Sequence, residues 1–227
     1  MSAYVVPAAP QTVVPVAGGG QFPVRRVFCV GRNYADHARE MGHDPTHEPP
    51  FFFSKPADAV TVAAAIPTDK ISKKLEFEGE LVVAIGKGGA DIKTGDALDH
   101  VYGYSVGCDL TRRDLQGEAK KAGRPWDMSK GFDNSAPIAP IQPASAIGHP
   151  AEGALTLAVN GSVKQNGDIS DMIWPIADVI AFLSGLVELA PGDLIFTGTP
   201  SGVGPLAKGD KVEIACAGVT SFSFTLI

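Results

Sequence analysis

Two glutamates separated by one residue, Glu78 and Glu80, stand at the start of an apolar run that continues to Gly86. The run is rich in β-branched residues and predicts a strand, in which alternate side chains point to the same face. Two carboxylates on one face repel each other, and partial burial adds a desolvation cost. A divalent cation between them would remove both problems. The pair is therefore a candidate metal site, although a solvated strand can also carry this spacing by chance.

A third carboxylate, Asp109, ends a second predicted strand over residues 101–109. Three carboxylates without a nearby histidine or cysteine favour a hard cation, Mg²⁺ or Mn²⁺, which leaves open positions for water and substrate oxygens. Glu76 lies on the same predicted face as Glu78. Four carboxylates around one divalent ion would leave two negative charges in excess, so we expect Glu76 to point to solvent beyond the strand end.

His37 and Glu40 form a candidate general base. They lie three residues apart in a short helix predicted over residues 34–41, so they share a face and the carboxylate can orient the imidazole. A pair of this kind is suited to activating water. An ordinary ion pair on a helix surface has the same spacing, and these residues alone leave both interpretations open.

Residues 197–204 form a Gly- and Thr-rich segment just past a predicted strand. Glycine lets the backbone approach a ligand, and the hydroxyl and amide groups can bind an oxyanion. The segment lacks the lysine spacing and the following helix of a nucleotide-binding loop. A plain turn is the alternative interpretation.

Many short elements must position these side chains, since the 227 residues include 26 Gly and 18 Pro. Asn160-Gly161 between two apolar runs predicts a hairpin with a type I′ turn. Apolar residues at helical spacing predict a helix over 176–187, after Pro175. We expect a β-rich single domain over residues 23–227 with about three helices, preceded by an extension over residues 1–22 that is weakly ordered or packed at an edge.

The composition excludes several classes of protein. The formal net charge is −6, and no basic run offers a footprint for nucleic acid. No apolar stretch approaches the length of a membrane span, and the N-terminus lacks the charged region of a secretory signal. Three widely spaced cysteines predict no disulfide framework. We expect a cytoplasmic protein with neither a nucleic-acid nor a membrane partner.

Four motifs occur in a fixed order along the chain. They are Gly31-Arg32-Asn33-Tyr34-Ala35-Asp36-His37, Glu78-x-Glu80, Asp109-Leu110-Thr111-Arg112-Arg113-Asp114 and Thr197-Gly198-Thr199-Pro200. In this order they resemble the fumarylacetoacetate hydrolase family, particularly its acylpyruvate hydrolase branch. The resemblance runs from about Phe22 to the C-terminus, and residues 49–56 further resemble the bacterial fumarylpyruvate hydrolases.

The resemblance implies a β-rich α+β fold, a mixed β-roll built around a barrel-like sheet with a few short helices, usually as a homodimer. It also implies a specific set of site residues. Mg²⁺ or Mn²⁺ would be held by Glu78, Glu80 and Asp109, catalysis would involve His37 and Glu40 on a mobile lid together with Lys130, and the substrate would meet Arg32, Arg113, Gln116 and Thr199.

The function implied is metal-dependent hydrolysis of a carbon–carbon bond in a 2,4-diketo acid, an acylpyruvate such as fumarylpyruvate. The products would be pyruvate and a carboxylic acid, as in the breakdown of aromatic compounds. One rival uses the same site as an oxaloacetate decarboxylase or tautomerase, or as a hydroxymuconate isomerase, because one fold can host all of these reactions. A second rival is a catalytically idle binding protein. The presence of both the His37/Glu40 pair and the three carboxylates argues against it.

Overall fold

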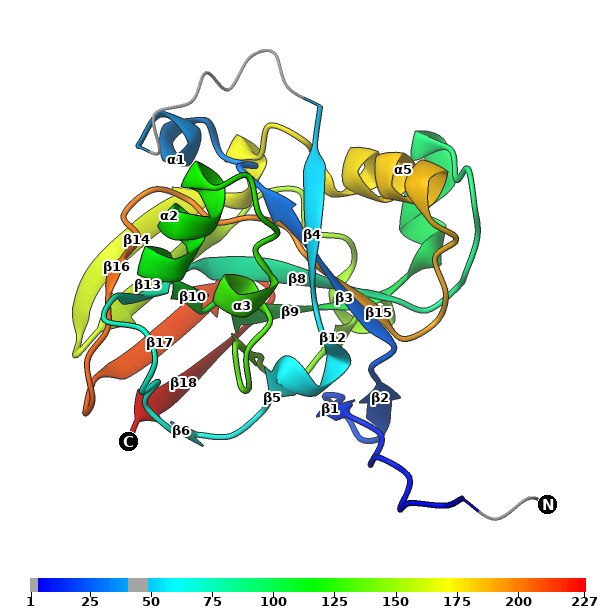
Figure 1. Cartoon of the computed structure of the whole chain (residues 1–227). Coiled ribbons are helices and arrows are strands. Elements are labelled where there is room, and N and C mark those ends of the chain that lie inside the picture. The colour runs from blue at the N-terminus through cyan, green and yellow to red at the C-terminus, as the bar shows by residue number, and fades with distance from the viewer. Residues whose placement is uncertain (1–3, 41–48) are drawn as a thin grey trace.

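The computed structural model describes residues 4–40 and 49–227. Strands dominate these residues, and the helices are short, as Figure 1 shows. The β-rich α+β class with a few short helices is confirmed. Two large sheets carry most of the strands, and none of the described sheets closes on itself as a barrel.

The larger sheet has six strands and supplies the floor of the site. Its order is β12 (Gln142–Pro143), β9 (Val101–Cys108), β8 (Gly79–Ile85), β15 (Asp193–Phe196), β3 (Arg26–Gly31) and β4 (Phe51–Lys55). The β15–β3 pair is parallel and the other pairs are antiparallel. Every residue of β8 is buried, which explains why its sequence is a continuous apolar run after Glu80.

The second sheet has five strands with one face on the core. Its order is β14 (Ser162–Asp168), β13 (Ala154–Val159), β17 (Lys211–Cys216), β18 (Thr220–Leu226) and β6 (Ala65–Ile66). The predicted β13–β14 hairpin is confirmed. Asn160 and Gly161 both have positive φ angles, 51° and 76°, as a type I′ turn requires.

Three small sheets complete the strand pairing. They are β10 (Thr111–Arg112) with β7 (Leu75–Phe77) and β16 (Gly204–Pro205), β1 (Val13–Pro15) with β2 (Gln21–Pro23), and β5 (Val60–Thr61) with β11 (Ala136–Pro137). Although β1 and most of β2 fall within the predicted extension, Val14 and Phe22 are buried in a cluster with residues of β3, β8 and β15. Part of the N-terminal segment therefore contributes to the core.

The helices lie at two sides of the sheets (Figure 1). They are α1 (Ala35–Glu40), α2 (Arg113–Lys121), α3 (Asp127–Lys130), α4 (Ala144–Ile147) and α5 (Ile176–Leu186), with 3-10 turns η1 (Ala57–Ala59), η2 (Thr94–His100) and η3 (Ile169–Asp171). The predicted helix after Pro175 is confirmed as α5, which packs with η2. No helix in the described part of the chain is long and apolar enough to cross a membrane.

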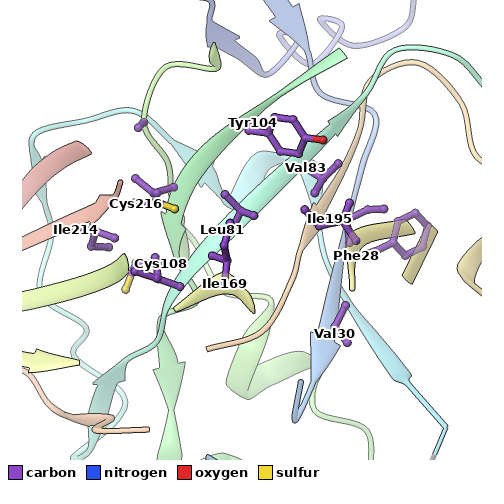
Figure 2. Close-up of a cluster of buried hydrophobic side chains, with 14 of the residues drawn as sticks. Phe28, Val30, Leu81, Val83, Tyr104, Cys108, Ile169, Ile195, Ile214 and Cys216 are labelled. Carbon is purple, nitrogen blue, oxygen red and sulfur yellow. The ribbon is translucent and has the colours of Figure 1, made fainter. Parts of the chain in front are cut away.

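Side chains from both large sheets form one core. Figure 2 shows Leu81 and Cys108, from β8 and β9, together with Ile214 and Cys216 of β17, and shows Ile195 of β15 in the same cluster. Burial of these side chains fixes β8 and β9 against the second sheet, because each buried aliphatic side chain contributes roughly 1.5–3 kcal/mol. The end of the β8–β9 pair, where the carboxylates lie, is thereby built on rigid elements.

Candidate functional site

Glu78, Glu80 and Asp109 meet at one end of the β8–β9 pair. The antiparallel register pairs Gly79 with Cys108, so Glu78 and Asp109 face each other one step further along, and the Asp109 amide donates to the Glu78 carbonyl at 2.8 Å. One ligand atom from each of the three carboxylates lies within 4.8 Å of the others, and all three side chains are buried. The structure thus brings together the three carboxylates that the sequence predicted as one set.

Lys130 links two of these carboxylates. Its Nζ lies 2.7 Å from Glu78 Oε2 and 2.6 Å from Asp109 Oδ2, and it donates to Thr111 Oγ1 at 2.7 Å. Its three ammonium hydrogens are matched by these three protein acceptors. Lys130 lies inside the site as expected, but contact with a substrate oxygen would require it to exchange one of these bonds.

Lys55, the last residue of β4, is a second buried lysine beside Asp109. Its Nζ lies 2.7 Å from Asp109 Oδ1, donates to the Leu110 carbonyl at 3.2 Å and also donates to the Lys130 carbonyl. The Lys55–Asp109 approach is an ion pair without hydrogen-bond geometry, so Asp109 Oδ1 remains a buried oxygen without a hydrogen-bond donor among the residues that the structure describes.

Arg113 binds the carboxylates of Glu76 and Glu78 together. Its Nε donates to Glu76 Oε2 at 2.6 Å, and its Nη2 donates to Glu78 Oε1 at 2.5 Å. The expectation that Glu76 points to solvent is wrong, because its side chain is only 7% exposed. Arg113 supplies the countercharge that permits a fourth buried carboxylate without requiring it to face an ion.

The charges around Glu78 and Glu80 act in opposite directions. Burial by itself would raise the pKa of Glu78, but Lys130 and Arg113 outweigh it and hold the pKa below its usual value. Burial, Asp109 and Glu78 raise the pKa of Glu80 well above its usual value, and the Gly198 amide, 2.8 Å from Oε2, offsets this only in part. Glu80 is therefore the carboxylate of the set that most needs a cation.

His37 and Glu40 pair on α1 as predicted. His37 is buried, and its Nδ1 lies 3.3 Å from Glu40 Oε2, which also accepts the Gly202 amide at 3.3 Å. In the neutral imidazole, the tautomer that donates Nδ1–H to Glu40 has an unprotonated Nε2 that can accept a proton. His37 lines the same pocket as Glu78 and Glu80, so its imidazole faces the site, whereas Glu40 lies outside the pocket lining and is exposed.

Asn33 anchors the segment that carries this pair. It is fully buried, donates to the carbonyls of Thr197 and Trp174 at 2.8 and 3.0 Å, and accepts the Trp174 amide at 2.7 Å. These bonds tie the chain between β3 and α1 to the end of β15 and to the residue before Pro175.

Arg32, the residue before Asn33, has a left-handed φ of 59°, a backbone conformation that residues other than glycine rarely adopt. Its guanidinium stacks over the Phe51 ring at 4.9 Å.

The segment over residues 197–204 positions Glu80 and closes the site. Gly198 has a φ of 96°, which glycine tolerates, and its amide points to Glu80. The Thr199 hydroxyl donates to the Gly79 carbonyl at 2.8 Å and accepts from Gln165 Nε2 at 2.8 Å. The proton of the Thr199 hydroxyl is thus used within the protein, although Thr199 still lines the pocket.

A pocket opens over the carboxylates, and every predicted catalytic or substrate residue except Glu40 lines it. Gln116, one turn after Arg113 on α2, presents its amide there, with Oε1 accepting from Arg113 Nη1 at 2.8 Å. The lining residues are Val30, Gly31, Arg32, His37, Phe51, Phe53, Glu78, Glu80, Arg113, Gln116, Lys120, Trp126, Lys130 and Thr199.

Residues 26–227 match the family model for the C-terminal domain of fumarylacetoacetate hydrolase. The chain belongs to the fumarylacetoacetate hydrolase family. The fumarylpyruvate hydrolase of Pseudomonas aeruginosa, solved in complex with Mn²⁺ and pyruvate, is 48% identical with a TM-score of 0.95, and the match covers 99% of each chain.

Two further relatives span different activities of this family. A Burkholderia cenocepacia protein, named as a candidate fumarylpyruvate hydrolase, is 55% identical with a TM-score of 0.93 over 100% of this chain and 95% of the other. An oxaloacetate tautomerase of Escherichia coli is 42% identical over 87% of this chain and 90% of the relative. The same fold therefore serves both hydrolysis and tautomerisation.

The residues present fit a divalent cation of the kind bound in the Pseudomonas relative. The ligand set consists of hard carboxylate oxygens, as Mg²⁺ and Mn²⁺ prefer. Asp109 Oδ1 is buried without a hydrogen-bond donor in the described part of the chain, and Glu80 lies beside two other carboxylates with no cationic partner there. Both features leave negative charge that an ion would compensate.

Sequence reasoning did not predict the contact between Lys55 and Asp109, because it left substrate contact and a salt bridge as alternatives for Lys55; the structure shows the salt bridge. The available signal was a lysine that ends the strand Phe51–Lys55, after three phenylalanines. Gln165 was also missed, since it lies on a hairpin strand far along the chain and reaches the site through Gly79 and Thr199. Nothing in its local sequence distinguishes it.

Replacing Lys55 with methionine should destabilise the protein by about 3–5 kcal/mol, because it removes one of the two cations paired with buried Asp109 and a donor to two carbonyls, those of Leu110 and Lys130. Urea unfolding measures this loss. Lys73→Met, at an exposed lysine, is the matched control and should change stability by less than about 0.5 kcal/mol. Equal stability of the two variants would contradict a stabilising role for the ion pair and hydrogen bonds of Lys55.

Proposed function

We propose that this chain hydrolyses the carbon–carbon bond of an acylpyruvate such as fumarylpyruvate, in the breakdown of aromatic compounds. The observation that carries the proposal is the meeting of two chemistries in one pocket: the buried imidazole of His37, paired with Glu40, and the carboxylate set of Glu78, Glu80 and Asp109. The similarity to a fumarylpyruvate hydrolase over nearly the whole chain supports it.

A bound Mg²⁺ or Mn²⁺, held by Glu78, Glu80 and Asp109, would supply a Lewis acid for the carboxylate and 2-oxo oxygens of the substrate. Ion pairs with Arg113 and Lys130 keep Glu78 in position, and an ion pair with Lys130 keeps Asp109 in position. Gln116 and Arg32 line the pocket where they can donate to substrate oxygens. In this proposal the 4-oxo carbon of the substrate lies toward α1, which carries His37.

His37 then acts as the general base. Its Nε2 removes a proton from water while Glu40 stabilises the imidazolium through Nδ1–H. The hydroxide adds to C4 of the substrate, and Lys130 contributes positive charge beside the developing oxyanion. The C3–C4 bond breaks, its electron pair passes to the pyruvate fragment, and the proton from His37 returns to C3. One water is consumed, and pyruvate and a carboxylic acid are formed.

The second candidate is tautomerisation of oxaloacetate, favoured by the 42% identity to the Escherichia coli enzyme. That reaction moves a proton between carbon and oxygen and needs no attacking water. Decarboxylation of oxaloacetate by the same site is a related alternative.

Parallel assays of one preparation, supplied with Mn²⁺, separate the candidates. We expect kcat/KM for fumarylpyruvate cleavage, measured as formation of fumarate and pyruvate in equal amounts, to exceed kcat/KM for oxaloacetate tautomerisation by at least about tenfold. The reverse ranking would favour the tautomerase. A catalytically idle protein would turn over neither substrate.

A further inference from the structure

Three aromatic rings form one wall of the pocket. Phe51 and Phe53 lie two residues apart on β4 and so share a face. The Trp126 ring packs edge-on against Phe51 and tilted against Phe53, with centroids 5.7 Å apart in both pairs. All three side chains line the pocket. This wall suits a flat, apolar stretch of ligand.

Lys120 lies at the edge of this wall. On α2 it follows Arg113 and Gln116 at helical spacing, so the three side chains share one face, and all three line the pocket. Its Nζ lies 5.0 Å from the Trp126 ring centroid. Within residues 4–40 and 49–227, Lys120 forms neither an ion pair nor a hydrogen bond through its ammonium group.

The other cations of the pocket provide a contrast. Arg113 is paired with Glu76 and Glu78, and Lys130 is paired with Glu78 and Asp109. Lys120 instead lies near positive charge. Partial burial, then Arg113 and Arg32, lower its pKa. A cation crowded by like charges and lacking a protein counterion gains from an anionic ligand.

Charge accounting also leaves room for a second anionic group. The four buried carboxylates are matched in number by four cations that pair with three of them; a divalent ion then adds two positive charges, of which the first substrate carboxylate neutralises one. Lys120 then remains uncompensated. The carboxylates are Glu76, Glu78, Glu80 and Asp109, and the cations are Lys55, Lys74, Arg113 and Lys130.

We infer that Lys120 is a specificity-determining residue that binds a carboxylate at the far end of the acyl chain. The preferred substrates are then 2-oxo acids with a second, terminal carboxylate, whose unsaturated middle part lies on Phe51, Phe53 and Trp126. The inference rests on the proposed function for the orientation of the substrate, with the 2-oxo acid end at the carboxylate set.

Two uncleavable probes test this assignment apart from catalysis. 2-Oxoheptanedioate and 2-oxoheptanoate have the seven-carbon length of fumarylpyruvate but no 4-oxo group, and only the first ends in a carboxylate. Calorimetric titration of the Mn²⁺-loaded protein gives the ratio of their dissociation constants. We expect the diacid to bind about five- to tenfold more tightly.

Lys120→Met should reduce the ratio of dissociation constants to near one, because only the binding of the diacid becomes weaker. Lys120→Arg should retain most of the preference for the diacid. Lys121→Met, at the neighbouring exposed lysine of α2, is the control and should leave the ratio unchanged. An unchanged ratio in Lys120→Met, an equal loss for both probes, or no preference in the unmodified protein would overturn the inference. Because neither probe is cleaved, failure to hydrolyse fumarylpyruvate would count against the proposed function and leave this test intact.

Discussion

Replacing Glu80 with glutamine should abolish tight Mn²⁺ binding while making the metal-free protein more stable. Glu80 has no cationic partner in the described part of the chain and lies beside Glu78 and Asp109, so its charge is costly without an ion. The amide keeps the size of the side chain and removes the charge. We expect Mn²⁺ affinity to fall by more than about 100-fold, since losing a ligand should cost at least as much as losing an outer-shell partner.

The pH dependence of stability gives an independent measurement of the same effect. The pKa of Glu80 in the folded protein lies above its ordinary value of 4.5. The contribution of Glu80 to the free energy of unfolding is therefore fully present below pH 4.5. It is lost as the pH rises through the raised pKa. Glu78 has a lowered pKa, so its contribution is lost only as the pH falls below about 4.5. The melting temperature of the protein in EDTA should therefore decline as the pH rises above about 5.

Glu80→Gln should remove that decline, whereas Glu118→Gln, at an exposed glutamate of α2, should keep both the decline and the Mn²⁺ affinity. If Glu80→Gln still bound Mn²⁺ tightly, or if its metal-free form were less stable than the unmodified protein, the assignment of Glu80 as an uncompensated metal ligand would be wrong.

Replacing His37 with asparagine should reduce kcat for fumarylpyruvate by about 10²–10⁴, because the attacking water loses its base. The three carboxylates and their lysine and arginine partners remain, so the increase in melting temperature on adding Mn²⁺ should be unchanged. The comparison of the two measurements distinguishes loss of a base from loss of the ion. Coupled detection of pyruvate gives the rate.

Glu40→Gln is the companion variant. It keeps a hydrogen-bond acceptor for His37 Nδ1 but removes the charge that stabilises the imidazolium, so a smaller loss, about 10-fold, is expected. Full hydrolytic activity in His37→Asn would mean that another group activates the water. Retention of oxaloacetate tautomerisation in that variant, with hydrolysis lost, would separate the two activities of the site.

The sequence predicted the parts of the site that depend on local periodicity. Strand parity placed Glu78 and Glu80 on one face, and the end of a second strand supplied Asp109. Helical spacing paired His37 with Glu40. Each of these relations follows from one element or from the pairing of two neighbouring strands, which is the information that local patterns carry.

The remainder of the site depends on contacts between distant elements. Lys55 reaches Asp109 from β4, and Arg113 buries Glu76, which local reasoning placed in solvent. The short helix α3 that presents Lys130 carries no periodic signal, since it spans only Asp127–Lys130. Burial of an ion pair is decided by which opposite charge the fold brings near, and a strand pattern contains no record of that partner.

The most direct test of the proposed function is a Mn²⁺ titration of protein stripped with EDTA, with fumarylpyruvate as substrate and pyruvate and fumarate as the measured products. We expect no turnover before Mn²⁺ is added, a rise that saturates at one ion per chain, and equal amounts of the two products. Turnover that persists in excess EDTA, or metal-loaded protein that forms no pyruvate from fumarylpyruvate, would contradict the proposal.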